Sequence, residues 1–394
     1  MKRLLILLLL AFPLMAQHRV SRIQINSSVP SRIVLSQSTL AEGRSYTDDD
    51  LKIAVARLKR LPFVYDARYR FEGETLILDV DSMTRFFGDL EASGLGTDDQ
   101  QTGVATIGGG GRMFLGTGGV AEVIARQHVA EGDDAQSLGA EYSHYGIGGS
   151  RFFAIAGLEQ IFEHESGFDS DPRLRLTVGY PLTLRSTITA NVLTAGFESR
   201  RTVPLVAQPL VTSAEQQLIN LRYTFDTTDD PYFARQGLVV SGGPEYANEK
   251  SRFQTVFFSV PDNELVFIRS VTDSTVTELV ADAKKFWPFR ERGTFFGEAG
   301  AAVSHRELDT VTNDSFPVPG DIDSTDLRLA AGYGHNLASR QRLEFAIGAA
   351  RHNFSRGDDF FGRSATFDSK SASAAYVLRR PFATVRLNLS YTFD

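Results

Sequence analysis

Residues 384–394 read TVRLNLSYTFD and alternate between apolar and polar side chains without a fault. The apolar phase holds Val385, Leu387, Leu389, Tyr391 and Phe393. A period of two over this length predicts a β-strand with one apolar face. About ten residues is the length that crosses a bilayer as a tilted strand. The two aromatic residues near the end match an interfacial girdle. A half-buried strand of a soluble sandwich would show the same alternation.

A second stretch repeats this ending far earlier in the chain. Residues 219–226 read INLRYTFD and residues 387–394 read LNLSYTFD, so six of the eight positions are identical. One physical explanation is that both strands leave the same membrane interface on the same side. We therefore expect Asp226 and Asp394 at the same end of the sheet. Chance similarity between two amphipathic strands is the alternative.

The start of the chain has the pattern of an export signal. Lys2 and Arg3 precede an apolar run, Leu4 to Phe12, and residues 13–16 resemble a cleavage region. We interpret residues 1–16 as a secretory signal peptide. No later segment approaches 18 apolar residues, so a membrane-spanning helix is not expected. An exported chain made of amphipathic strands predicts the outer membrane of a Gram-negative-type cell.

Composition narrows the classes further. The 394 residues contain no cysteine, and the net charge is −7. Disulfide bonds therefore contribute nothing to the stability of the fold. No basic patch suggests nucleic acid as a partner. The 34 glycines and 29 phenylalanines are unusual for a helical membrane protein and ordinary for a β-barrel.

Residues 19–82 show the pattern of a small α+β domain. Thr47 is a plausible helix N-cap, because three aspartates follow it in the positive first turn. Leu51, Val55 and Leu58 then fall on one helical face, and Pro62 ends the helix. The expected order is a weak strand over 19–26, a short helix after Pro30, the Thr47 helix, and strands over 63–71 and 75–80.

This order resembles a known module. Gly43 before Tyr46-Thr47, the segment Leu61-Pro62-Phe63-Val64 and the final hairpin are similar to a single POTRA domain. The resemblance covers residues 19–82. It implies a periplasmic position in front of an outer-membrane barrel. It also implies that client chains add as strands to an exposed sheet edge.

Residues 84–394 show strand-like runs of about ten residues separated by turn signals. We predict a transmembrane antiparallel barrel with sixteen strands, or fourteen if weak segments are dropped. Bacterial single-chain barrels have even strand numbers. The expected strands are 86–94, 102–115, 119–130, 136–145, 151–163, 172–182, 187–199, 217–226, 237–248, 278–287, 294–305, 326–337, 342–354, 360–368, 371–378 and 384–394.

Arginines fall repeatedly on the phase opposite to the apolar side chains. Arg222, Arg328 and Arg386 follow this rule in three separate strands. We interpret these three as lumen-facing. The solvated face of a soluble sheet would give the same pattern. The signal peptide and the number of such strands favour the lumen.

The segment between the two central strands carries a second resemblance. Asp226, Asp229, Pro231 and Gly237 are similar to the Asp…Asp-x-Pro…Gly periplasmic turn of the bacterial surface antigen family, the barrels of BamA- and TamA-like assembly factors. Ala234 stands where that family often has a second proline. Such barrels present the last strand as an assembly signal, which here implies Leu387, Leu389, Tyr391 and Phe393. The resemblances together cover nearly the whole mature chain.

One segment departs from the family. Residues 306–325 match its sixth extracellular loop and contain Gly320, but they lack the Arg-Gly pair that the family carries there. The leading expectation remains insertion or translocation of polypeptides at the outer membrane. Outer-membrane lipids, unfolded polypeptide clients and periplasmic or lipoprotein subunits would be its partners. A passive porin-like channel is one alternative, and the missing pair favours it. A surface-interaction barrel using loops such as 251–277 is another.

No catalytic constellation rises above background, so we expect no enzyme and no cofactor. The glycines at 108–111 lie inside a strand pattern and lack the Gly-Lys-Ser/Thr of a phosphate loop. His164 between Glu163 and Glu165 could bind a metal, although a solvated strand end is the simpler reading. Asp321, Asp323 and Asp326 could meet a calcium ion, although an acidic loop in solvent is simpler.

Overall fold

The computed structural model describes residues 17–97, 101–130, 133–163, 168–201, 210–259, 264–312, 316–317, 320–338, 340–356 and 364–393. Residues 1–16, interpreted above as a signal peptide, lie outside these ranges, as do His164, Glu165 and Asp394.

The N-terminal domain pairs two helices with a three-stranded sheet. Its sheet has the order β2-β5-β4, with β2 parallel and β4 antiparallel to the central strand. A separate pair, β1 with β3, was not expected from the sequence. The elements are β1 (Gln17–Val20), β2 (Arg22–Ser27), α2 (Ser31–Ser38), β3 (Arg44–Thr47), α3 (Asp48–Lys59), β4 (Val64–Glu72) and β5 (Thr75–Ser82).

The predicted helix start at Thr47 is confirmed. Its hydroxyl accepts from the Asp50 amide at 3.2 Å, and the Asp50 carboxylate accepts from the Thr47 amide at 3.1 Å. This reciprocal capping box satisfies two backbone donors that a helix start leaves free. It therefore fixes where α3 begins.

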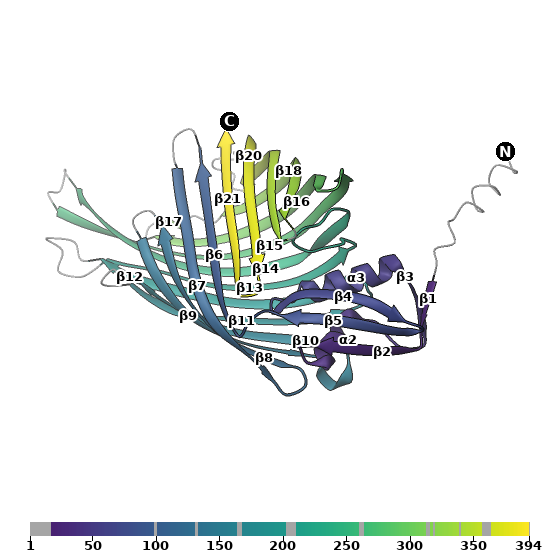
Figure 1. Ribbon diagram of the computed structural model, residues 1–394. Helices are drawn as coiled ribbons and strands as arrows, with labels where there is room; N and C mark the ends of the chain where they lie inside the picture. The colour runs from purple at the N-terminus through teal and green to yellow at the C-terminus, as the bar shows by residue number, and fades with distance from the viewer. Residues whose placement is uncertain are drawn as a thin grey trace, which may run out of the picture.

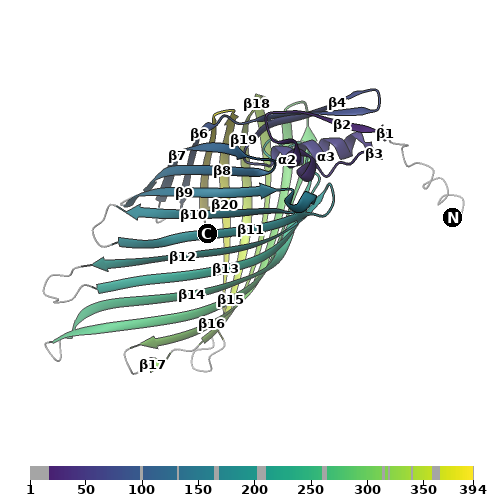
Figure 2. The same ribbon diagram turned by 90° about the horizontal axis from the view of Figure 1, so that it is seen from below.

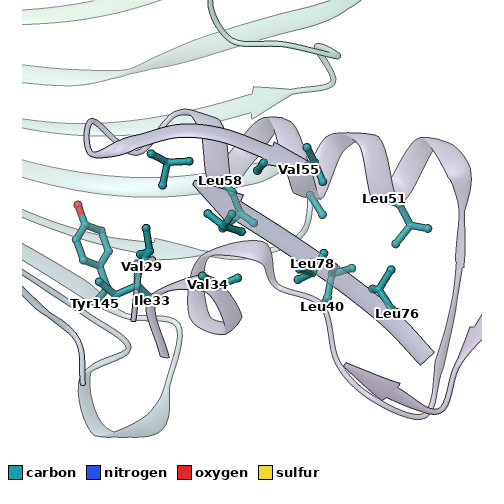
Figure 3. Packing of buried hydrophobic residues seen from close by; sticks show 14 of the residues in the cluster. Val29, Ile33, Val34, Leu40, Leu51, Val55, Leu58, Leu76, Leu78 and Tyr145 are labelled. Atoms are coloured by element: carbon teal, nitrogen blue, oxygen red, sulfur yellow. The ribbon is translucent and has the colours of Figure 1, made fainter. Parts of the chain in front are cut away.

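The core of this domain extends into the next one. Leu51, Leu58 and Leu78 are fully buried between the helices and the sheet. Val120 and Tyr145, which come from the following strands, belong to the same cluster. Figure 3 shows Tyr145 directed at the domain beside Val29 and Ile33. The domain is thus packed against its neighbour rather than tethered to it.

The rest of the chain forms one closed sheet, with the domain at one end of its strands (Figure 1, Figure 2). Its strands are β6 (Phe86–Gly96), β7 (Gln101–Leu115), β8 (Gly119–Ala130), β9 (Asp133–Tyr145), β10 (Phe153–Glu163), β11 (Phe168–Pro181), β12 (Ser186–Arg201), β13 (Leu210–Asp226), β14 (Gly237–Ser259), β15 (Glu264–Phe289), β16 (Gly293–Thr312), β18 (Gly320–Ala338), β19 (Gln341–Arg356), β20 (Ser364–Arg380) and β21 (Ala383–Phe393). A turn of 3₁₀-helix, η1 (Ile147–Gly149), follows β9, and a short piece, β17 (Phe316–Pro317), pairs with the end of β16.

The described residues form a barrel of fifteen strands, so the prediction of sixteen is wrong. The expected strands 360–368 and 371–378 are one strand, β20, paired with β19 from Ser364 to Leu378 without a break. The polar run Asp368-Ser-Lys-Ser371 suggested a turn. It contains neither glycine nor proline, and its side chains alternate as a strand requires.

An odd number of strands changes how the barrel closes. The last strand, β21, runs in the same direction as the first, β6, and the two pair in parallel over nine residue positions. This β6/β21 seam is the one parallel pairing among the described barrel strands. Parallel pairing is slightly less stable per residue than antiparallel pairing. Gly88, Gly94 and Gly96 add no side chains to it.

Because the number of strands is odd, the two strands that carry the matching octapeptides run in opposite directions. β13 ends beside the N-terminal domain, where Asp226 pairs with Arg60. β21 starts at that end and runs away from it, so Phe393 lies at the far end (Figure 1). The expectation that Asp226 and the chain end share one side is therefore wrong. The shared sequence reflects two strands of the same amphipathic type.

Large apolar side chains cover the outer face of the barrel. Leu329, Ile347 and Leu389 are 66%, 69% and 65% exposed. Aromatic residues cluster on this face at the domain end, where Phe289, Phe295 and Tyr333 are in mutual contact. The opposite phase of the same strands carries the charged side chains. No helix of the described chain is long and apolar enough to cross a membrane.

Two expected loops are largely strands. Residues 251–277 belong mostly to a long hairpin, in which β14 and β15 stay in register from Gly237 to Ser259. Residues 306–325 contain the end of β16 and the start of β18, paired from Leu308 with Gly320 onward. The polar residues in these segments suggested loops. In the structure the paired strands continue beyond the apolar band of the barrel as a polar β-ribbon.

Candidate functional site at the closed mouth of the barrel

The N-terminal domain lies against the ring of hairpin turns at one end of the barrel. It bonds to the β7/β8, β9/β10, β11/β12, β13/β14, β18/β19 and β20/β21 turns or their flanking residues. In the described chain the β15/β16 turn alone has no hydrogen bond or ion pair to the domain. The β11/β12 and β20/β21 turns are almost opposite in the ring. The domain therefore bridges the mouth.

The first contacts come from α2. Arg32 donates to the carbonyl of Gly146 at 2.9 Å and to the hydroxyl of Thr117 at 3.3 Å. In return, Arg151 of the barrel donates to the carbonyl of Thr39 at 3.2 Å. Guanidinium groups suit this role because their donors point in several fixed directions. One helix is thereby bonded to two adjacent hairpins.

Both ends of α3 are bonded to the barrel. At its start, Arg185 pairs with the capping residue Asp50 at 2.7 Å. At its end, Arg60 pairs with Asp226 and donates to the hydroxyl of Thr228 at 3.0 Å, and Lys59 pairs with Asp230 at 3.2 Å. The helix thus spans from the β11/β12 turn to the β13/β14 turn.

Asp66 is the central acceptor of the interface. Its side chain is almost fully buried and pairs with Lys59 at 3.3 Å and with Arg340 of the barrel at 2.7 Å. Arg68 adds a third pairing at 2.8 Å. Burial alone would raise the pKa of Asp66, but the bond from Arg340 and the Lys59 charge hold it to about 2. The carboxylate therefore stays ionised at any ordinary pH.

Two further buried arginines are held by neutral oxygens. Arg57 donates to the carbonyls of Gln37 and Thr183 and to the hydroxyl of Thr187. Burial, with help from Arg60, lowers the pKa of Arg57 to about 10. Arg379 of β20 donates to the Val64 carbonyl. Such groups lose water on docking, so their bonds are costly to break one at a time.

The β13/β14 turn, residues 227–236, folds inward across the mouth. We call this segment the strap. Ala234 is buried against Phe286 and Phe296 on the inner face of the barrel, with Ala346 beside them. Arg342, which is 1% exposed, donates to the Ala234 carbonyl at 2.7 Å. Arg235 donates to the carbonyl of Arg290 at 2.6 Å. The strap thereby reaches the β15/β16 turn, which the domain leaves free.

The four residues of the expected turn motif lie within the strap or directly beside it: Asp229 and Pro231 inside, Asp226 and Gly237 at its two ends. Asp226 accepts from the amide and hydroxyl of Thr228, both at 2.7 Å. Asp229 accepts from the Arg235 amide at 2.9 Å. Pro231 lies between these aspartates and the buried Ala234. Gly237 has φ +118, and a side chain there would collide with the Thr227 carbonyl at 2.5 Å.

The three arginines interpreted as lumen-facing lie on the phase opposite to the exposed apolar residues. Arg328 and Arg222 both approach Asp282, at 2.7 and 3.6 Å. Arg386 lies 3.9 Å from Asp89. Arg222 and Arg328 thus share one partner, whereas Arg386 has another, so the structure does not join the three arginines to one site.

The terminal-strand residues occupy the outer face of β21. Leu387, Leu389, Tyr391 and Phe393 are all exposed there, and Tyr391 and Phe393 are in ring contact. Tyr391 also covers Gly96 of β6. Their role as an assembly signal remains a prediction.

The calcium hypothesis is wrong. Asp323 pairs with His305 at 2.7 Å, while Asp326 pairs with His352 at 2.6 Å from the other face of β18. Within the described chain, no group of three or more His, Cys, Asp or Glu could hold a metal. The His164 hypothesis lies outside the described residues.

Sequence reasoning missed most of the interface. None of Lys59, Arg60, Asp66, Arg340 and Arg379 was singled out as a binding residue. One signal was available: two cations at the end of a helix, Lys59 and Arg60, match two aspartates in a later turn, Asp226 and Asp230. Complementary charge of this kind can join segments that are distant in sequence.

The fold and the site define a fifteen-stranded β-barrel whose mouth is covered by a small α+β domain. No family model matches the sequence, and curated proteins give no match. Among solved structures, BamA from Haemophilus ducreyi lacking POTRA domains 1-3 is similar, with 11% identity and a TM-score of 0.42, covering 95% of this chain and 81% of that one.

Two further solved structures are similar at the same level. CdiB from Acinetobacter baumannii gives 10% identity and a TM-score of 0.38, covering 95% of this chain and 74% of that one. The ferric citrate transporter FecA in its unliganded form gives 10% identity and a TM-score of 0.40, covering 78% and 59%.

The depressed pKa of Asp66 predicts an acid-sensitive interface. A carboxylate whose pKa is lowered on folding stabilises the folded state fully above its unfolded pKa of about 3.9. That stabilisation, about 2 kcal/mol here, is lost as pH falls toward about 2. We expect the urea midpoint of the parent to exceed that of Asp66→Asn at pH 5. This difference between the two urea midpoints should decrease steadily as the pH falls toward 2. A gap that does not change with pH would contradict this assignment.

Proposed function

We propose that this protein is a bacterial outer-membrane barrel that receives unfolded polypeptides through its N-terminal domain and inserts or translocates them. The domain would lie in the periplasm. The membrane assignment is supported by the outer face, where large apolar side chains such as Leu329 and Ile347 are exposed. A continuous apolar surface of this extent is unfavourable in water, whereas a barrel in lipid presents such a band with aromatic girdles.

The observation that carries the proposal is the position of β4. The carbonyls at its start, on Val64 and Tyr65, accept from Arg379 and Arg340 of the barrel rim. Beyond them, β4 is an edge of the domain sheet and has no second strand partner in the described chain. An extended chain could add to this edge by backbone hydrogen bonds.

A chain added along β4 would arrive beside the β6/β21 seam. Arg379 precedes the β20/β21 turn, and the Pro381 carbonyl in that turn accepts from the Thr84 amide at 2.9 Å. The edge of the domain and the parallel pairing of the barrel therefore lie next to each other. A porin-like channel would need an open mouth, whereas this mouth is bridged by the domain. This arrangement favours client handling over passive flow.

A crosslinking experiment tests the proposal. A photo-reactive amino acid would replace Arg70 on the outer half of β4, in full-length protein reconstituted in liposomes. The matched control carries it at Lys52, an exposed residue of α3. We expect an unfolded outer-membrane protein to crosslink at position 70 and to become protease-protected, with little crosslinking at position 52. Equal crosslinking at both sites, or steady conductance without protection of the client, would favour the passive channel.

A further inference from the structure

The strap closes the sector of the mouth that the domain leaves free. The domain bonds to the turns on either side. In the described chain the β15/β16 turn has no hydrogen bond or ion pair to the domain, but Arg235 of the strap donates to the Arg290 carbonyl there. The strap also covers Phe286 and Phe296 on the inner face of β15 and β16. Closure of the mouth is therefore divided between two elements.

The strap is built as a unit that holds its own shape. Asp230 accepts from the amides of Tyr232 and Phe233 at 2.9 and 3.1 Å, and Asp229 accepts from that of Arg235. These bonds are internal, so they would survive a movement of the whole segment. Gly237 at its end has φ +118, a conformation that other residues rarely adopt. Glycine at this joint permits the backbone to change direction.

The contacts that hold the strap in place divide into two sets. On the wall side, Ala234 is packed against two rings, Arg342 donates to its carbonyl, and Arg235 donates to the Arg290 carbonyl. On the domain side, Lys59 pairs with Asp230, and Arg60 donates to the Thr228 hydroxyl and pairs with Asp226, the β13 residue that precedes the strap. Among the described residues, the ion pair to the strap itself comes from the end of α3. The end of α3 therefore supplies the charged contacts that keep the strap in its closed position.

We propose that the strap is a gate for an aqueous route past the docked domain, held shut by the end of α3. When Arg60 and Lys59 move away from Asp226 and Asp230, the strap rotates about Gly237. This movement opens the part of the barrel mouth that lies in front of β15 and β16. The gate controls the mouth whether or not the barrel handles clients. It differs from release of the whole domain, because the α2 contacts to the β9/β10 turn stay in place.

Single-channel conductance of the full chain in planar bilayers tests the gate. Arg60→Gln removes the pairing with Asp226 and the bond to Thr228, and Asp230→Asn removes the pairing with Lys59. We expect each to raise the open fraction about tenfold over the parent, the change that loss of about 1.4 kcal/mol from the closed state produces. Two variants are used so that the test survives a folding defect in one of them, and folding is checked by the heat-modified shift in gels.

Crosslinking then identifies the strap as the moving part. The chain has no native cysteine. Ala234→Cys with Ala346→Cys, bridged by a short bifunctional thiol reagent, should return the Arg60→Gln channel to the closed level. The control pair Ala346→Cys with Ser373→Cys lies within the wall, at directly paired positions of β19 and β20, and should leave it open. Unchanged conductance in both opening variants, or a bridged strap that still conducts, would overturn the proposal.

Discussion

Replacement of Asp66 by alanine is expected to release the N-terminal domain from the barrel. Asp66 is the shared partner of Lys59 and Arg340, which lie on the two sides of the interface. Removing one member of a buried ionic group leaves the others desolvated and unpaired, which costs about 3–5 kcal/mol. This loss should shift the docking equilibrium by roughly a hundredfold or more.

Thiol reactivity gives the measurement. Val120 is a barrel residue that the docked domain buries, so a Val120→Cys background reports exposure of the interface. The control is Asp79→Ala on the neighbouring strand, where the carboxylate pairs with Arg70 at 3.7 Å in solvent. Such a surface pair is worth about 0–1 kcal/mol. Asp66→Ala should speed labelling far more than Asp79→Ala. Similar rates in the two variants would contradict the assigned role of Asp66.

Replacement of Leu389 by arginine is expected to damage the barrel far more than replacement of Asn388. Leu389 lies on the outer face of β21, and Asn388 on the other phase of the same strand. An arginine facing lipid near the bilayer midplane costs about 2–4 kcal/mol, while lumen positions tolerate charge. The measurement is the fraction of folded, heat-modified barrel in unboiled gels. Equal losses for the two variants would reject the register of β21 and weaken the membrane assignment.

Much of the fold follows from local patterns in the sequence. The N-cap at Thr47 and the strand at 384–393 depend on residues within a few positions of one another, and both appear as expected. The strand count failed because one polar run, Asp368 to Ser371, does not say whether the chain turns or continues. Only pairing with β19 decides that. A single merged strand then reversed the direction of β21 and the position of the chain end.

The site was harder to predict because its parts are far apart in sequence. Asp66 and Arg340 are separated by 274 positions and meet only when the barrel closes. The motif at Asp226 to Gly237 was expected to be an ordinary turn. Its inward fold depends on Ala234 fitting between Phe286 and Phe296, which no local pattern reveals. The spacing of apolar residues predicts which face of a single helix or strand is buried. It does not predict which separate elements meet, and this site is formed where several elements meet.

The central claim is a membrane-spanning barrel of fifteen strands, with the domain at one end and the chain terminus at the other. Single cysteines test it directly in intact cells, because the natural chain has none. Lys52→Cys reports the domain end, and Thr392→Cys reports the far end of β21. With a membrane-impermeant maleimide, we predict labelling of Thr392→Cys from outside, and of Lys52→Cys only after the outer membrane is permeabilised. Labelling of both positions from the same side would contradict the account.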